Sequence, residues 1–424
     1  FGTTGWPNFP EQKVVTRETD RAEPNRREVM KLFGAAPVIG YLPGFDEGDL
    51  GTADRLKSID LDDSLLDTDL SVALDGDTAA VGMPPQSSPD GADDGSVALF
   101  SLRDGRWTRE AMRTTTSGGM QFGSAVEVDG PTALIGAPLS GVGRSAPGGS
   151  VAVFSRNNGR WNRETTLRRE IASGVDSFGA ALAIDGDTAV VGASTATTNG
   201  GTRTGVAQVY TRTGGTWNER ATLWPSTGVE RFGRAVALDG DTLVVGAREQ
   251  SVSIDSGVVH VFTRESDGWR QQARLAPRGT GRDDGFGTDL SLDDDTLVAG
   301  APTETNNRGT NAGAAYVFTR RGQEWGTASI IRGAARTDDD QFGTSVALEG
   351  ETALIGSQAD PTPIAFTCEG ERWTECTTDE HDTSGLPTRT GTAVALEGGR
   401  ALVGVAGTTT GDRTQDGGVL FFEP

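Results

Sequence analysis

The 424-residue sequence is poor in lysine, cysteine, histidine and methionine. Its only lysines are Lys13, Lys31 and Lys57, and lysine plus arginine number 38 against 60 acidic residues, which gives a formal net charge of −22. Nucleic-acid binding needs a basic surface that displaces the counterions of phosphates, so this balance excludes a nucleic-acid partner. No apolar run is long enough to cross a bilayer as a helix, which excludes a membrane span.

The excess of acid with almost no lysine indicates a protein from a concentrated salt environment, as in haloarchaea. In molar salt the Debye length shrinks to about 3 Å, so like charges on a surface no longer repel one another over long distances. An ordinary acidic extracellular protein from a GC-rich genome is the alternative.

Cysteine and histidine are too few for most metal or nucleophile chemistry. Cys368 and Cys376 flank Trp373 on the two arms of one expected hairpin, and we expect a cross-strand disulfide in an exported protein, with two free buried thiols as the alternative. His260 lies in a predicted strand, and His381 lies among acidic residues of a loop. The sequence shows no nucleophile elbow, phosphate-binding glycine loop or zinc-protease helix, so no catalytic residues are predicted.

The N-terminal part differs in composition from the rest. Residues 1–25 are polar and unpatterned, which predicts a disordered extension. Residues 26–45 begin with Arg26-Arg27 and continue into a short, weakly hydrophobic run from Leu32 to Gly44. This arrangement resembles a twin-arginine export signal, with an arginine-rich amphipathic helix as the alternative. The signal implies export in the folded state to the cell surface or the exterior, and residues 50–424 form the remaining domain.

That domain is a series of repeats. A unit such as residues 232–247, FGRAVALDGDTLVVGA, recurs seven times at a spacing of about 54 residues. The glycine near its end marks the copies: Gly82, Gly136, Gly192, Gly246, Gly300, Gly356 and Gly404. Each period contains four expected strands, named A to D here, as in residues 178–184, 241–247, 258–262 and 269–275. Aspartate and glycine between strands A and B favour a type I′ hairpin.

The pattern of apolar residues predicts how the strands are covered. Strands A and B are apolar on consecutive residues, as in sheets that are buried on both faces. A tryptophan recurs once per period, as a packing wedge between neighbouring sheets. It stands at Trp107, Trp161, Trp217, Trp269, Trp325 and Trp373. We predict an all-β fold, a seven-bladed β-propeller of four-stranded antiparallel blades.

The repeated motifs resemble the FG-GAP repeat of integrin-α-type β-propellers. Phe-Gly opens strand A in five copies, and Gly-Ala-Pro closes strand B at Gly136 and Gly300. The resemblance covers about residues 66–422 and implies binding of protein or glycan without chemistry. Family members often carry a calcium loop between strands A and B, but residues 238–242 are too short to enclose an ion. We therefore expect no metal and no cofactor.

The ends of the repeat array predict how the ring closes. The last copy stops at residues 419–422 after its strand C, and residues 53–56 resemble a strand D in their distance from the first copy. We expect this N-terminal strand to complete the seventh blade and to leave a monomeric ring without a dangling edge.

Binding residues favour variable loops on a rigid scaffold. The A–B and C–D connections are tight turns on one face, whereas the B–C and D–A connections are longer and share the other. Acidic residues and one histidine on this loop face are candidate ligand residues, although such runs are more often solvated loops: Asp283, Asp284, Asp338, Asp339, Asp340 and His381. We expect a non-catalytic binding or adhesion propeller. A polysaccharide-acting enzyme with its site in the central channel, or a structural surface-layer component, is the alternative.

Overall fold

The computed structural model describes most of the repeat region. The described residues are 55–56, 70–84, 95–114, 121–139, 148–169, 176–197, 204–225, 229–249, 257–277, 284–333, 338–358, 363–370, 372–376, 392–405, 408–410, 413–415 and 418–422. Within these ranges every regular element is a strand, so no helix there could span a membrane. The predicted extension and export signal, residues 1–45, lie outside the described residues.

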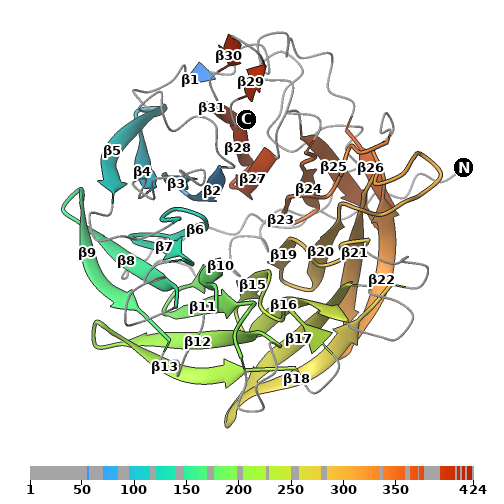
Figure 1. Ribbon diagram of the computed structural model, residues 1–424, viewed down its shortest axis with the longest axis horizontal. Coiled ribbons are helices and arrows are strands. Elements are labelled where there is room, and N and C mark those ends of the chain that lie inside the picture. The colour runs from blue at the N-terminus through green and yellow to red at the C-terminus, as the bar shows by residue number, and fades with distance from the viewer. Residues whose placement is uncertain are drawn as a thin grey trace, which may run out of the picture. The chain divides into compact units, whose positions relative to one another are not determined.

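The strands form a propeller of seven blades, as predicted (Figure 1). Blade 1 contains β2 (Ser71–Asp75), β3 (Thr78–Met83), β4 (Ser96–Arg103) and β5 (Arg106–Thr114). Blade 2 contains β6 (Val126–Asp129), β7 (Thr132–Ala137), β8 (Ser150–Asn157) and β9 (Arg160–Leu167). Blade 3 contains β10 (Phe178–Asp185), β11 (Thr188–Ala193), β12 (Val206–Thr213) and β13 (Thr216–Leu223).

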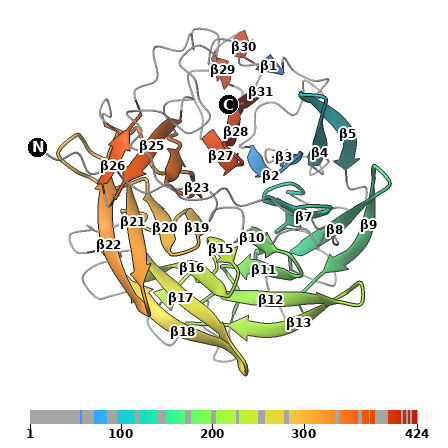
Figure 2. The same ribbon diagram turned by 180° about the vertical axis from the view of Figure 1, so that it is seen from behind.

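The other blades continue this order. Blade 4 contains β14 (Val229–Glu230), β15 (Val236–Asp239), β16 (Thr242–Glu249), β17 (Gly257–Glu265) and β18 (Gly268–Leu275). Blade 5 contains β19 (Leu290–Asp293), β20 (Thr296–Ala301), β21 (Ala314–Arg321) and β22 (Glu324–Ile331). Blade 6 contains β23 (Val346–Glu349), β24 (Thr352–Ile355), β25 (Ile364–Glu369) and β26 (Arg372–Glu375). Strand A of each blade lies near the ring centre, and strand D lies at the rim (Figures 1 and 2).

Both ends of the array contribute to blade 7. It contains β1 (Arg55–Leu56), β27 (Thr392–Glu397), β28 (Arg400–Val405) and β31 (Gly418–Phe422), and a hairpin of β29 (Thr408–Thr410) and β30 (Arg413–Gln415) lies between β28 and β31 in the chain. Arg55 pairs with Leu420, and Leu56 pairs with Val419. The prediction that an N-terminal strand closes the ring is therefore confirmed.

The core lies between the blades. Each cluster of buried side chains draws on two neighbouring blades, such as blades 1 and 2 around Trp161 or blades 7 and 1 around Phe421. Four of the Phe-Gly phenylalanines are fully buried in these clusters: Phe178, Phe232, Phe286 and Phe342. All six repeating tryptophans pack against a cluster that includes the preceding blade. The continuous apolar runs of strands A and B thus cover the facing sheets.

The Phe-Gly and Gly-Ala-Pro motifs have one structural explanation. The Gly233 amide donates to the Gly246 carbonyl of its own blade at 3.0 Å. Its carbonyl oxygen lies so close to Gly192 of the preceding blade that a Cβ at position 192 would overlap it. The same contact recurs between four further neighbouring pairs of blades. Two glycines per repeat are therefore needed because the backbones of adjacent blades touch.

The predicted type I′ turn between strands A and B is wrong in most blades. The turn residues are a glycine with φ between 50° and 57°, followed by Asp77, Pro131, Asp187 or Asp241, whose φ is not positive. Positive φ at the first turn residue alone is the type II′ pattern, and proline, with φ fixed near −65°, fits only the second position. The preceding aspartate ends strand A instead of entering the turn.

The expected disulfide is not formed, because both cysteines are free thiols. Strand register explains this difference. Cys368 lies opposite Trp373, whereas the Cys376 amide donates to the carbonyl of Ala365 at 2.9 Å. The two cysteines are thus at different levels of the hairpin. The Cys376 thiol contacts Thr367 Oγ1 at 3.7 Å instead.

Candidate functional site

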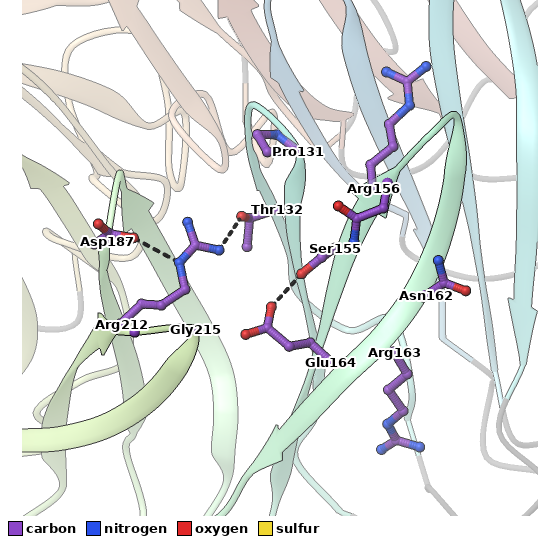
Figure 3. A pocket seen from close by; sticks show the side chains of 12 residues that line it. Pro131, Thr132, Ser155, Arg156, Asn162, Arg163, Glu164, Asp187, Arg212 and Gly215 are labelled. Carbon is purple, nitrogen blue, oxygen red and sulfur yellow. Dashed lines mark hydrogen bonds and ion pairs between the residues drawn. The ribbon is translucent and has the colours of Figure 1, made fainter.

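One cavity, of about 600 Å³, lies on the turn face between blades 2 and 3 (Figure 3). Its polar side chains bind one another: Arg212 contacts Asp187 at 2.7 Å and Thr132 at 3.1 Å. Arg320 makes the same two contacts, to Asp295 and to Thr242 of the preceding blade. Each of these arginines also lies over the tryptophan of its own hairpin. Because this arrangement repeats, it clamps neighbouring blades together, and we do not regard it as a ligand site.

The central channel is a second cavity, of about 480 Å³, and strand A of every blade contributes to its wall. Alanine, serine, valine and leucine dominate this wall. Three of its lining residues are ionisable: Glu127, Arg234 and Asp289. They occupy positions that hold alanine, serine or threonine in most other blades. These three side chains therefore distinguish one part of a largely uncharged channel.

The two carboxyl groups of the channel titrate at unusually high pH. Burial, together with the negative charge of Asp289, raises the pKa of Glu127 to about 8. Burial also raises the pKa of Asp289 to about 6, although the amides of Val346 and Leu290 donate to its carboxylate and oppose that rise. Glu127 is therefore mainly protonated near neutral pH, whereas Asp289 is mainly ionised.

A third cavity, of about 250 Å³, lies where the B–C and D–A connections of blades 4 and 5 meet. We name it the arginine pocket, because Arg231, Arg234 and Arg248 all line it. Arg231 follows β14, Arg234 precedes β15, and Arg248 lies in β16. The remaining lining residues are small or polar: Gly257, Gly285, Thr288, Pro302 and Thr303. Arg234 and Thr288 also line the channel, so the two cavities share a wall.

Arg234 is the most constrained of these arginines. Its guanidinium donates to Thr288 Oγ1 at 2.7 Å, and the Thr288 hydroxyl donates in turn to the carbonyl of Gly285. Burial, together with the positive charges of Arg231 and Arg248, lowers the pKa of Arg234 to about 10. Within the described part of the chain no carboxylate forms an ion pair with Arg234. No described carboxylate therefore neutralises the positive charge that Arg234 brings to the pocket.

The sequence reasoning missed the arginine pocket, although the repeats contain a signal for it. The position of Arg231 holds Gln121, Ser177, Gly285 and Gln341 in other blades. The position of Arg234 holds Ser124, Ala180, Thr288 and Thr344, and that of Arg248 holds Pro84, Pro138, Ser194, Pro302 and Gln358. Blade 4 alone carries arginine at all three positions. Comparing each blade with the others would have identified it.

The predicted acidic candidates have structural contacts. Asp284 is only 4% exposed, and its carbonyl accepts from the Thr303 amide at 3.2 Å. Asp338 accepts from the amide of Thr310, and Asp339 accepts from the side chain of Asn311. These two contacts hold the B–C connection of blade 5 against the D–A connection of blade 6.

Of the remaining candidates, only Asp340 lies in the described part of the chain. The Asp340 carbonyl accepts from the Gln358 amide at 3.1 Å. Asp283 and His381 lie outside the described residues. The described ranges contain no group of three or more histidine, cysteine, aspartate or glutamate side chains that could hold a metal ion.

Comparison with known proteins agrees with this fold. The FG-GAP repeat family model matches residues 161–210, 217–262 and 269–318, so the chain carries FG-GAP repeats in a seven-bladed propeller. No curated protein sequence matches the chain.

Solved structures with a similar fold include a candidate 6-phosphogluconolactonase from Bacteroides uniformis, with 10% identity and a TM-score of 0.51 over 73% of this chain and 84% of that one. A candidate 6-phosphogluconolactonase from Bacteroides fragilis has 12% identity and a TM-score of 0.48 over 72% and 82% of the two chains. The periplasmic gluconolactonase of Pseudomonas aeruginosa has 15% identity and a TM-score of 0.47 over 73% and 84%. At such identities the likeness concerns the fold alone.

Proposed function

We propose that this protein is an exported binding or adhesion propeller that engages a protein or glycan through its B–C and D–A loop face. The observation that carries the proposal is the arginine pocket on that face. Arg231, Arg234 and Arg248 break the repeat pattern at three positions of one blade and line one cavity. A departure from the repeat that the ring itself does not need is a reason to look for a ligand there.

The rest of the molecule supports a scaffold role. The arginines on the turn face bind side chains of their own and neighbouring blades, and the acidic loop residues Asp338 and Asp339 hold another loop. Such a network fixes the loop face against a rigid ring. Rigid presentation lowers the entropy lost on binding, which suits a recognition surface.

An array of glycans and surface proteins, probed with the whole protein in molar salt, tests this function. We expect binding to a small set of ligands, and we expect competition between ligands that share the loop face. Binding that persists when the B–C connections of blades 4 and 5 are exchanged for those of other blades would contradict the proposed surface. Self-association without any array signal would favour the structural surface-layer alternative.

Export requires its own test, because it rests on the sequence of Arg26-Arg27 and the run from Leu32 to Gly44. We expect the wild-type protein outside the cytoplasm of a host with a twin-arginine pathway. Replacing both arginines by lysine should retain the protein inside, since that pathway reads the arginine pair. Equal export of the lysine variant would overturn this part of the proposal.

A second candidate function is a polysaccharide-acting enzyme, and the channel favours it. Glu127 is mainly protonated and Asp289 is mainly ionised near neutral pH, and glycosidases assign acid and base roles to carboxyl groups whose pKa values differ in this way. Release of reducing sugar from a polysaccharide panel, lost in both Glu127→Gln and Asp289→Asn, would support it. Release by both variants at the wild-type rate would exclude a catalytic role for these residues.

A further inference from the structure

We propose that the arginine pocket recognises an acidic sugar residue, whose carboxylate or sulfate group it receives among its three guanidinium groups. The proposal rests on the proposed function in one respect only, namely that the sugar is part of a larger ligand bound by the loop face. The site itself is argued from the residues that line the cavity.

Arg231 and Arg234 offer hydrogen-bond donors that no described residue uses. A guanidinium carries five N–H donors in a planar fork that matches the two oxygens of a carboxylate or sulfate. Arg234 directs one such donor to Thr288. In the described part of the chain, the side chain of Arg231 has no hydrogen-bond or ion-pair partner. Glu230 lies opposite Arg248 in the pairing of β14 with β16, and it does not line the cavity.

The electrostatics favour one anionic group and disfavour a polyanion. Three arginines around one small cavity repel one another, and an oxyanion placed among them removes that repulsion. The whole protein, however, has a formal charge of −22. At low ionic strength, a ligand with many negative charges would be repelled by the surrounding surface. A ligand with one charge per recognised unit is attracted only by the pocket.

The size and the polarity of the cavity favour a sugar over an apolar side chain. A volume of about 250 Å³ is below the usual range of about 300–1,000 Å³ for whole drug-sized ligands. It therefore fits one compact unit of a larger molecule. Among the described residues Pro302 is the only apolar side chain that lines it, whereas Thr288 and Thr303 lie beside the arginines. Hydroxyl groups of a sugar can bind such a wall, and an apolar peptide anchor cannot.

The other blades supply variants that should fold. Arg231 has φ of 53°, and Gln121 and Gln341 occupy the same position with φ of 64° and 53°. Arg231→Gln therefore copies a residue that the fold already accepts there. Arg234→Ala copies Ala180, and Arg248→Ser copies Ser194. Each variant removes one positive charge and introduces a residue that another blade carries at the same position.

Isothermal titration of the whole protein in molar NaCl tests the proposal. The probes are glucuronate and glucose 6-sulfate, with glucose as the uncharged control and inorganic sulfate and phosphate as free anions. We expect saturable binding of at least one acidic sugar and none of glucose. Arg234→Ala should weaken that affinity at least tenfold, and Arg234→Lys should weaken it too, because an ammonium group cannot bind two oxygens in parallel.

Arg220→Gln is the matched control, because Arg220 is an exposed arginine on β13 and should leave the affinity unchanged. Unfolding curves establish that each variant is folded. An unchanged affinity in folded Arg231→Gln, Arg234→Ala and Arg248→Ser would overturn the proposal. So would equal affinity for glucose, or for inorganic sulfate and phosphate. An array ligand that binds wild type and the triple variant equally would leave the loop-face function standing and reject the pocket. Binding of an acidic sugar, with no ligand found on the array, would support the pocket and reject the loop-face function.

Discussion

The carboxylate of Asp239, at the end of strand A in blade 4, accepts a hydrogen bond of 2.6 Å from the backbone amide of Asp294 in the A–B turn of blade 5. The same link recurs between successive blades around the ring. The acceptors Asp75, Asp129, Asp185, Asp293 and Glu349 receive the turn amides of Gly130, Gly186, Gly240, Gly350 and Gly398. The acidic residue that ends strand A thus joins its blade to the next in blades 1 to 6.

Asp239→Ala should destabilise the ring by about 1–2 kcal/mol, because it removes the acceptor of this amide. Asp239→Asn should have a smaller effect. Burial raises the pKa of Asp239, so folding favours its neutral form, which the amide imitates. The free energy of unfolding in urea measures both changes. Equal losses in the two variants would show that the charge, and not the acceptor, matters.

Gly192→Ala should destabilise the protein by about 2–4 kcal/mol, because the new Cβ overlaps the Gly233 carbonyl of the next blade and two backbones must separate. Gly404→Ala is the matched control at the same repeat position. There a Cβ would meet side-chain atoms of Val72 and Leu70 at 3.0 and 3.1 Å, and these can shift. We expect a loss of about 1 kcal/mol in this control. Similar losses would contradict the backbone contact as the reason for the repeated glycine.

Trp161→Ala should destabilise the protein by about 3–5 kcal/mol. The Trp161 side chain is 2% exposed between blades 1 and 2, and its Nε1 donates to Glu110 of blade 1 at 3.2 Å. Trp224 lies outside the repeat position and is 57% exposed. Trp224→Ala should therefore change stability by no more than about 0.5 kcal/mol. Thermal unfolding followed by circular dichroism compares the two, and comparable losses would reject the packing role of the repeating tryptophan.

The stability of the protein should fall as the pH rises from 5 to 9. Glu127 and Asp289 have pKa values of about 8 and 6, above those of exposed carboxyl groups, so the native state holds protons that the unfolded chain has released. Their contribution is complete below the unfolded pKa and is lost as the pH passes through the folded pKa. Glu127→Gln should reduce this loss by about 1–3 kcal/mol, allowing for water in the channel.

Unfolding in urea at five pH values measures this dependence. Glu324→Gln controls for the removal of one acidic group, because Glu324 is exposed on β22. We expect the control to retain the pH dependence of the wild type. A Glu127→Gln protein with the wild-type slope would show that another group causes it.

The repeat made the fold predictable. Seven copies of an apolar strand pair identified the blades, and the missing last strand predicted the pairing of Arg55 and Leu56 with β31. Strand register could not be predicted to the single residue. For that reason the disulfide was wrong, since Cys376 lies three residues beyond Trp373, the residue opposite Cys368. The predicted turn type was wrong for a similar reason. The aspartate before the turn glycine accepts a hydrogen bond from the next blade instead of entering the turn.

The candidate site was harder to predict than the ring. Acidic loop residues such as Asp338 attract attention in a sequence, yet their oxygens bind neighbouring backbone amides. Arginines such as Arg234 are common in this chain, and nothing in a single repeat distinguishes those that bind a tryptophan hairpin from those that line a cavity. The distinction depends on which positions of adjacent blades face the same space. That information requires the three-dimensional arrangement.

The pairing of β1 with β31 also determines how the chain can acquire its structure. Blades 1 to 6 each consist of consecutive segments, so each can form as soon as its own strands are available. Blade 7 instead joins segments that lie before and after all the others, and closing so long a loop is entropically unfavourable and slow. We expect blade assembly to precede ring closure. A mechanical load applied across β1 and β31 would act on this one strand pair first and open the ring there, while the six consecutive blades remained intact.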